Sequence, residues 1–172
     1  SNTITNSGTL QAEDTAVSLV DSNMLTNTST GMIIGDTVGG AGAGIVGNSS
    51  NTVINDGSVA ASDNGITLND SNIVTNSGTV TSVGGTGIVL DNFNQLDTTG
   101  TVTGGIDGIE LGDSNTPVNI GGFVSGGDDG VQAGSNNGIG TYGSVTIRGN
   151  DEGVDLLGSN NTFSNNGAVQ GD

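Results

Sequence analysis

The side chains of this chain that could do chemistry are carboxylates, because 18 of its 172 residues are aspartate or glutamate, and histidine, lysine and cysteine are absent. Asp70, Asp91 and Asp113 each follow a similar apolar segment, first 21 and then 22 residues apart. On stacked coils of that length the three carboxylates would lie above one another, and like charges directly opposite each other destabilise a sheet. Calcium takes carboxylate and carbonyl oxygens at flexible corners, so it could neutralise such a column.

Six aspartates are therefore candidate calcium ligands: Asp70, Asp91, Asp107, Asp113, Asp128 and Asp129. The simpler interpretation is that they are solvated turn residues, which suit turn geometry and keep the chain soluble. We expect that the protein requires no cofactor, and that calcium is the metal it would bind.

Paired aspartates give an enzymatic alternative, because glycosidases place two carboxylates on either side of the scissile bond. Gly127-Asp128-Asp129-Gly130 resembles the paired-aspartate coil of polygalacturonase-like β-helix enzymes and phage tailspikes. The histidine and basic residues that accompany the pair in polygalacturonases are missing, and a lyase would have only Arg148 to neutralise a uronate. We expect that the chain is not an enzyme, with a polysaccharide-binding or glycan-degrading β-helix as the alternative.

The formal charge of −17 is spread along the chain and restricts its partners. Nucleic acid is not expected, because phosphate binding needs basic side chains to release counterions and Arg148 is the one such residue. The same count excludes an anionic membrane surface. No apolar run reaches the roughly 20 residues that span a bilayer, so we expect no membrane insertion in this segment.

A repeat positions these side chains. A glycine followed two residues later by an apolar residue recurs along the chain, at Gly8, Gly57, Gly78, Gly100, Gly122, Gly143 and Gly167. From Gly57 onward the intervals are 21, 22, 22, 21 and 24 residues, and the 49 residues between Gly8 and Gly57 hold two coils. The chain should form about eight coils, the last incomplete, which are stabilised by stacking on one another.

Each coil contains three short segments with the alternation of a β-strand. We expect the first segment to point inward Ile4, Leu25, Val53, Val74, Leu96, Val118, Ile139 and Phe163. The second should point inward Leu10, Ile33, Val59, Val80, Val102, Val124, Val145 and Val169, and the third repeats a G-I-x-L pattern, as in Gly87-Ile88-Val89-Leu90. The sequence thus predicts an all-β parallel β-helix with three strands per coil, a single domain over residues 1–172.

Turn residues mark the corners between these strands. Asn6, Asn55, Asn76 and Asn165 precede the second strands, and we expect a ladder of asparagine side chains inside this corner. A second corner follows the third strands at Asp21-Ser22-Asn23, Asp70-Ser71-Asn72, Asp113-Ser114-Asn115 and Gly158-Ser159-Asn160. Two features fit less well: Pro117 lies in a first strand, where it removes a ladder bond, and the glycine-rich residues 35–44 predict a loop or bulge.

At these residues the chain resembles right-handed parallel β-helices, and most of all the passenger regions of autotransporter and haemagglutinin-like adhesins. The segments Ile4-Thr5-Asn6-Ser7-Gly8-Thr9-Leu10 and Val74-Thr75-Asn76-Ser77-Gly78-Thr79-Val80 are typical of such repeats. The resemblance implies export, a long rod and display at the bacterial surface.

We therefore expect a secreted or cell-surface structural rod, either a segment of a surface adhesin or a subunit of a self-assembling filament. Neither end of the sequence shows a cap, so the open coils would continue in a longer rod or stack on further copies. Self-association, end to end or side by side, is the expected contact, followed by glycans of a host or neighbouring cell. Ice binding is a weaker alternative, suggested by the outward threonine pairs at Thr79-Val80-Thr81 and Thr101-Val102-Thr103.

Overall fold

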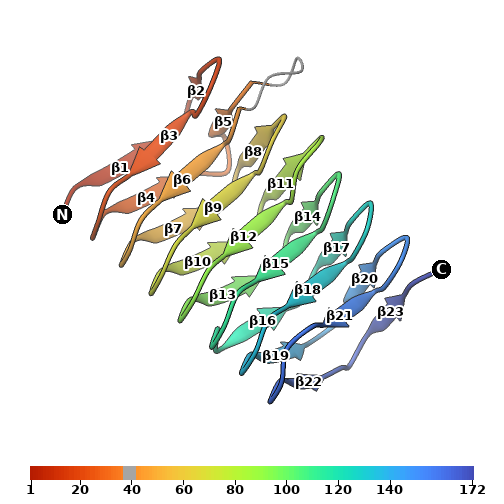
Figure 1. Ribbon diagram of the computed structural model, residues 1–172. Coiled ribbons are helices and arrows are strands. Elements are labelled where there is room, and N and C mark those ends of the chain that lie inside the picture. The colour runs from red at the N-terminus through yellow and green to blue at the C-terminus, as the bar shows by residue number, and fades with distance from the viewer. Residues whose placement is uncertain (37–41) are drawn as a thin grey trace.

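A computed structural model describes residues 1–36 and 42–172, and over these residues the chain forms 23 strands and no helix. The strands stack into three parallel sheets that run the length of the molecule (Figure 1). Each coil contributes one strand to each sheet, which gives seven complete coils and an eighth with two strands. The structure therefore confirms the predicted all-β parallel β-helix with three strands per coil.

We name the sheets by the order of their strands in a coil. The first sheet contains β1 (Thr3–Asn6), β4 (Met24–Asn27), β7 (Thr52–Asn55), β10 (Ile73–Asn76), β13 (Gln95–Thr98), β16 (Val118–Ile120), β19 (Gly138–Thr141) and β22 (Thr162–Ser164). The second contains β2 (Thr9–Gln11), β5 (Met32–Ile34), β8 (Ser58–Ala61), β11 (Thr79–Ser82), β14 (Thr101–Thr103), β17 (Phe123–Ser125), β20 (Thr146–Arg148) and β23 (Ala168–Gln170). The third contains β3 (Val17–Leu19), β6 (Ile45–Gly47), β9 (Ile66–Leu68), β12 (Ile88–Leu90), β15 (Ile109–Leu111), β18 (Val131–Ala133) and β21 (Val154–Leu156).

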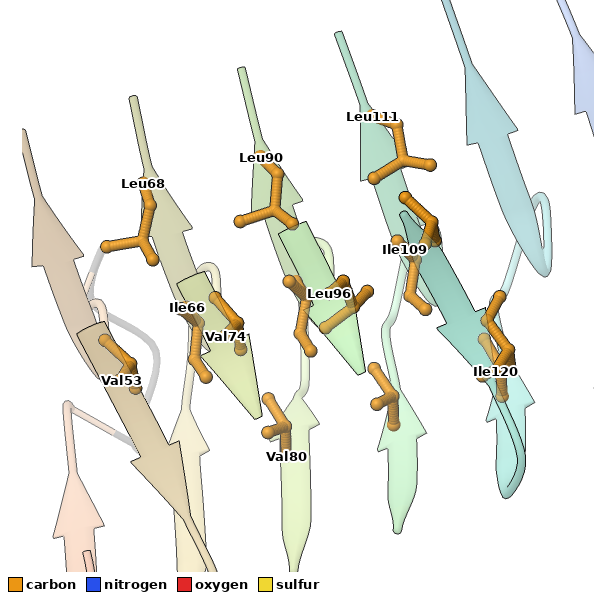
Figure 2. Close-up of a cluster of buried hydrophobic side chains, with 14 of the residues drawn as sticks. Val53, Ile66, Leu68, Val74, Val80, Leu90, Leu96, Ile109, Leu111 and Ile120 are labelled. Atoms are coloured by element: carbon orange, nitrogen blue, oxygen red, sulfur yellow. The ribbon is translucent and has the colours of Figure 1, made fainter. Parts of the chain in front are cut away.

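The core is a column of aliphatic side chains enclosed by the three sheets. Every second side chain along a strand points inward. In β9, for example, Ile66 and Leu68 are both fully buried, and Thr67 between them is not. Figure 2 shows the leucines of the third sheet, Leu68, Leu90 and Leu111, placed alike on neighbouring strands. Each coil buries only a few such side chains, worth about 1.5 to 3 kcal/mol apiece, so its stability depends on the coils above and below.

Glycines allow the corners of successive coils to approach closely. A Cβ added to Gly78 would lie 2.1 Å from the carbonyl oxygen of Gly57, and one added to Gly100 would lie 2.0 Å from that of Gly78. A second column of glycines precedes the third sheet, where a Cβ on Gly87 would meet the carbonyl oxygen of Gly108 at 2.6 Å. At Gly57, Gly78, Gly100 and Gly122 the recurring glycine is thus a steric requirement of stacking.

The register differs from the prediction in the seventh coil. Ile147, and not Val145, pairs with Val124 and Val169 in the second sheet. Val145 is also buried, but it stands at the corner position that Gly122 and Gly167 occupy in the neighbouring coils. The corner between β19 and β20 has four residues where the corner between β16 and β17 has two, and this insertion shifts Gly143 out of the glycine column.

Two segments that fit the repeat less well are accommodated at its corners. Strand β16 begins at Val118, one residue after Pro117, and the carbonyl oxygen of Pro117 still accepts a hydrogen bond from the Leu96 amide. Within the glycine-rich segment 35–44, residues 37–41 lie outside the described part of the chain. The ends of the segment meet, because a Cβ on Gly35 would lie 2.3 Å from the carbonyl oxygen of Ala43.

No helix long and apolar enough to cross a membrane occurs in residues 1–36 or 42–172.

Candidate functional site

The corner between the first and second sheets contains the predicted asparagine ladder. Asn6 donates from its side-chain amide to Oδ1 of Asn27, Asn27 to Asn55, and Asn55 to Asn76, each at 2.8 Å. Asn76 then donates to the hydroxyl of Thr98 at 3.1 Å. Asn27, Asn55 and Thr98 are fully buried, so the polar groups of this corner are paired inside the rod.

A second asparagine ladder lies at the corner between the third and first sheets, and its hydrogen bonds run from backbone to side chain. The Asn51 amide N–H donates to Oδ1 of Asn72, Asn72 to Asn94, and Asn94 to Asn115, at 2.7 to 2.8 Å. Asn115 continues the ladder to Asn137. The sequence had placed Asn160 in this series, but Asn137 bonds Asn161, because Asn160 takes the preceding position, which has positive φ in successive coils.

The corner aspartates do not form the column that the spacing predicted. Pairing of the third sheet aligns Leu68 with Leu90 and Leu111, so Asp91 stands one position before Asp70 and Asp113. Asn92 occupies this position in the coil between them. The backbone N–H of Asn92 donates to Oδ1 of Asp70 at 3.1 Å, and the backbone N–H of Asp113 donates to Oδ1 of Asn92 at 2.9 Å. The two aligned carboxylates are therefore two coils apart, which weakens the repulsion that had suggested calcium at this corner.

Acidic side chains on consecutive coils are aligned at the corner that precedes the third sheet, and we call them the acidic column. The register aligns the residues that follow Asp107, Asp129 and Glu152, which places these three carboxylates on consecutive coils. Asp107 accepts the Asp129 amide N–H and Asp129 accepts that of Glu152, both at 3.1 Å. Asp107 and Asp129 are only 3% and 4% exposed, so two carboxylates are buried side by side.

Burial and mutual repulsion shape the electrostatics of this column. Burial raises the pKa of Asp107, the hydrogen bond from the Asp129 backbone opposes that rise, and the charges of Asp129, Asp128 and Asp155 add to it. The pKa of Glu152 is raised by loss of hydration and by Asp129. Glu110, on the outer face of β15, also has a raised pKa, because of burial and the charges of Asp107 and Asp91.

The structure brings together some of the six candidate calcium ligands and separates others. Asp107 and Asp129 are neighbours, Asp70 and Asp113 share a column, Asp91 stands apart from that column, and Asp128 is exposed beside the buried Asp129. Within residues 1–36 and 42–172, no group of three or more acidic, histidine or cysteine side chains is arranged to hold a metal ion. Calcium binding stays the alternative that the sequence suggested for these aspartates.

The sequence suggested that its aromatic residues Phe93, Phe123 and Tyr142 are exposed and could contact glycans or a neighbouring rod, and Tyr142 is indeed a surface residue. It lies in the four-residue corner between β19 and β20, and its hydroxyl donates to Oδ1 of Asp97 at 2.6 Å, two coils away. A Cβ added to Gly121 would lie 2.7 Å from the ring, so the ring rests against that glycine. The available signal was the interval from Gly143 to Gly167, which at 24 residues is longer than the others and marks the longer corner.

The phenol of Tyr142 is held in its neutral form. Partial burial, the hydrogen bond to Asp97 and the charge of Asp97 together raise its pKa to about 12. The hydroxyl is therefore protonated and available as a donor to Asp97 over the physiological range of pH.

No protein-family model, curated protein or solved structure matches this chain. Function must therefore be inferred from the geometry of the chain itself and from its repeats.

Proposed function

We propose that this chain is an extracellular structural rod that mediates adhesion, as a segment of a bacterial surface adhesin or as a subunit of a filament. The observation that carries the proposal is the unbroken parallel register of the first and second sheets over eight coils. At about 4.8 Å per coil, this stack is roughly 38 Å long. The repeated segments that resemble adhesin passenger regions, such as Ile4 to Leu10, support export and surface display.

Side-chain ladders at the corners support a rigid spacer. The asparagine bonds from Asn6 to Thr98 and from Asn23 to Asn161 run parallel to the long axis and link each coil to the next. Bending the rod would break several buried bonds at once, and each leaves a polar group unsatisfied at a cost of about 1 to 3 kcal/mol. A chain that is stiff along its whole length suits a part that holds a binding surface away from a cell.

The same architecture supports self-association as part of this proposal. Strands β1, β2 and β3 at one end, and β21, β22 and β23 at the other, each pair on one side only within this chain (Figure 1). Unpaired strand edges accept further strands, and further coils of one rod or a second copy would supply them. The charge of −17 opposes side-by-side contact between rods, so end-to-end contact is favoured.

Electron microscopy of the purified chain at several concentrations, with and without calcium, tests the filament form. Thin fibres that lengthen with concentration are expected from end-to-end stacking. Short monodisperse rods in every condition would remove the filament and leave the spacer, whereas collapsed or globular particles would contradict the rod itself.

Adhesion is tested separately with beads that carry the chain. We expect coated beads to adhere to bacterial or host-cell surfaces more than beads coated with an equally acidic unrelated protein. Equal adhesion of the two would contradict the adhesive part of the proposal.

Glycan degradation is the alternative that the paired aspartates suggested. Asp129 is buried, and its backbone N–H donates a hydrogen bond to Asp107. Asp128 is exposed, so the two carboxylates of the pair lie in different environments. An enzyme would release reducing ends from a polysaccharide, and we expect no such release with the purified chain.

A further inference from the structure

We propose that the ring of Tyr142 is the platform of a binding site for a neutral sugar chain, with Asp97 and Asn119 as its polar groups. The inference deepens the proposed function and rests on it, since it names the ligand class and the surface through which the rod attaches. The site lies at the edge of the outer face of the first sheet, over β13, β16 and β19.

The longer corner of the seventh coil creates the platform. Tyr142 occupies the corner position of Gly121 in the coil before, since its amide N–H donates to the carbonyl oxygen of Ile120. The absence of a side chain at Gly121 lets the ring lie against the backbone there, and the ring then spans from coil seven to Asp97 in coil five. The added residues of this corner thus produce an aromatic side chain that is exposed and fixed at once.

Two restraints fix the ring before any ligand arrives. One face rests on Gly121 and the hydroxyl is bonded to Asp97, while 39% of the residue remains exposed. A binding group already held in its bound conformation loses little conformational entropy on binding. Tyrosine suits this role because it offers a large rigid surface with few rotatable bonds.

A row of polar and small residues continues from Asp97 across the outer face. The register aligns Asp97 with Asn119 and Asn119 with Gly140. A Cβ added to Gly140 would meet a single atom within 4 Å, Oδ1 of Asn119 at 4.0 Å, so the space above this glycine is open. The row therefore offers a carboxylate, an amide and an open backbone position beside the ring.

This combination fits a polyhydroxylated ligand. The apolar C–H face of a pyranose packs on an aromatic ring, and its hydroxyls pair with planar amides and carboxylates, which fix its orientation. The ligand must be neutral, because Asp97 is in the site and the chain carries a net charge of −17. The single basic residue, Arg148, lies on the second sheet and so cannot pair with an acidic ligand at the first sheet. Uronates and other acidic sugars would be repelled.

Tyr142 itself reports on binding, because it is the one tyrosine of the chain and there is no tryptophan. We would titrate the full chain with dextran, a soluble β-glucan, galactomannan and chitin oligosaccharides as neutral probes, and with polygalacturonate as an acidic probe. At least one neutral probe is expected to change the tyrosine emission saturably, and to retard the chain in an affinity gel, while polygalacturonate does neither.

Variants separate the platform from the fold. Tyr142→Ala should lose retardation in the gel, and Tyr142→Phe, which keeps the ring without the bond to Asp97, should weaken binding several-fold. The matched control is Phe123→Thr, which removes an aromatic ring from the outer face of the second sheet, where the aligned neighbours are Thr101 and Thr146. It should bind as the unaltered chain does, and circular dichroism should show the same fold in all three variants.

Three results would overturn the inference: no response to any neutral probe, equal retardation of Tyr142→Ala, or equal binding of polygalacturonate. A change of emission with protein concentration alone would assign the ring to a contact between copies and would overturn it as well. If beads coated with the chain still adhere in any of these cases, the adhesive rod stands and only the sugar site falls.

Discussion

At the scale of single residues, the buried corners show how one side-chain type holds a repeat together. Asparagine carries both a donor and an acceptor, so a column of asparagines can pass hydrogen bonds from coil to coil indefinitely. Asn55 is a typical member, since it accepts from Asn27 and donates to Asn76 with no exposed surface. The sequence predicted this ladder because the asparagine recurs at a fixed distance before a glycine.

Replacement of Asn55 by alanine should destabilise the rod more than most substitutions. It would leave the Asn76 acceptor and one bond of the Asn27 amide unmade in a buried corner, so we expect a loss of about 2 to 4 kcal/mol in the free energy of unfolding. The measurement is urea unfolding followed by circular dichroism.

The matched variant is Asn55→Thr, because threonine already occupies this column at Thr98 and accepts from Asn76 there. Threonine should recover part of the loss. If alanine and threonine cost the same, the ladder bonds contribute little and the corner is held by packing alone.

Asp107 is a residue at which charge opposes the fold. Its pKa is raised, chiefly by burial, so the folded chain binds a proton more tightly than the unfolded chain does. Stability should then rise as the pH falls through the folded pKa and should be lower at neutral pH. Asp107→Asn keeps the acceptor for the Asp129 amide and removes the charge, and we expect a gain on the order of 1 kcal/mol at pH 7.

Thermal unfolding at several pH values measures this effect. The advantage of Asp107→Asn over the unaltered chain should shrink as the pH falls through the raised pKa of Asp107, where that carboxyl itself becomes protonated. Asp128→Asn is the control, because it removes a neighbouring charge from an exposed position. An equal gain from both variants would show that net charge matters and burial of Asp107 does not.

At the scale of elements, the strands could be predicted and some of the corners could not. Alternation predicted most of the inward residues of the three sheets, because strand geometry has a fixed period of two. Asp91, Val145 and Asn160 were each assigned one or two positions out of register, and all three lie at or just after a corner. Most corners vary in length by one or two residues from coil to coil, and the corner between β5 and β6 is several residues longer. Counting along the chain therefore loses the register at the corners, and hydrogen bonding within each sheet restores it.

The glycine column beside the second sheet makes a prediction about how elements stack. Gly100→Ala would place a methyl group 2.0 Å from the carbonyl oxygen of Gly78, so the two coils must separate and their hydrogen bonds weaken. We expect a loss of about 3 kcal/mol in the free energy of unfolding, again measured by urea unfolding.

Gly8→Ala is the control for this prediction, because a Cβ at Gly8 meets nothing within 4 Å. It should be neutral, or stabilising by about 0.5 kcal/mol through the unfolded chain. Equal losses at Gly8 and Gly100 would mean that these glycines are needed for their flexibility and that contact between coils is not the cause.

At the scale of the whole molecule, the rod combines an apolar interior with a surface that carries almost no positive charge. The chain has eighteen acidic residues and one arginine, and its net charge of −17 opposes side-by-side contact between rods. The same charge acts along each rod, since Asp107, Asp129 and Glu152 repeat on consecutive coils. This repulsion between coils should lower the stability of the stack.

Salt should stabilise the rod by screening this repulsion. The Debye length falls from about 30 Å at 0.01 M salt to about 10 Å at 0.1 M salt. At the lower concentration charges several coils apart still repel one another, and at the higher concentration only charges on neighbouring coils do. We expect Tm to rise by about 3 to 6 °C over that range of sodium chloride, as measured by circular dichroism. A constant Tm would show that the coils do not repel one another appreciably.

Calcium and magnesium at equal ionic strength distinguish screening from a bound metal. Both ions screen alike, but the site that calcium prefers has flexible carboxylate and carbonyl ligands, whereas magnesium demands stricter octahedral geometry. Because Asn92 separates Asp70 from Asp113, and Asp107 and Asp129 already accept backbone hydrogen bonds, we expect equal gains in Tm from the two ions. A larger gain with calcium that is lost in Asp129→Asn, but kept in Asp91→Asn, would place a calcium ion at the acidic column and turn its repulsion into a link between coils.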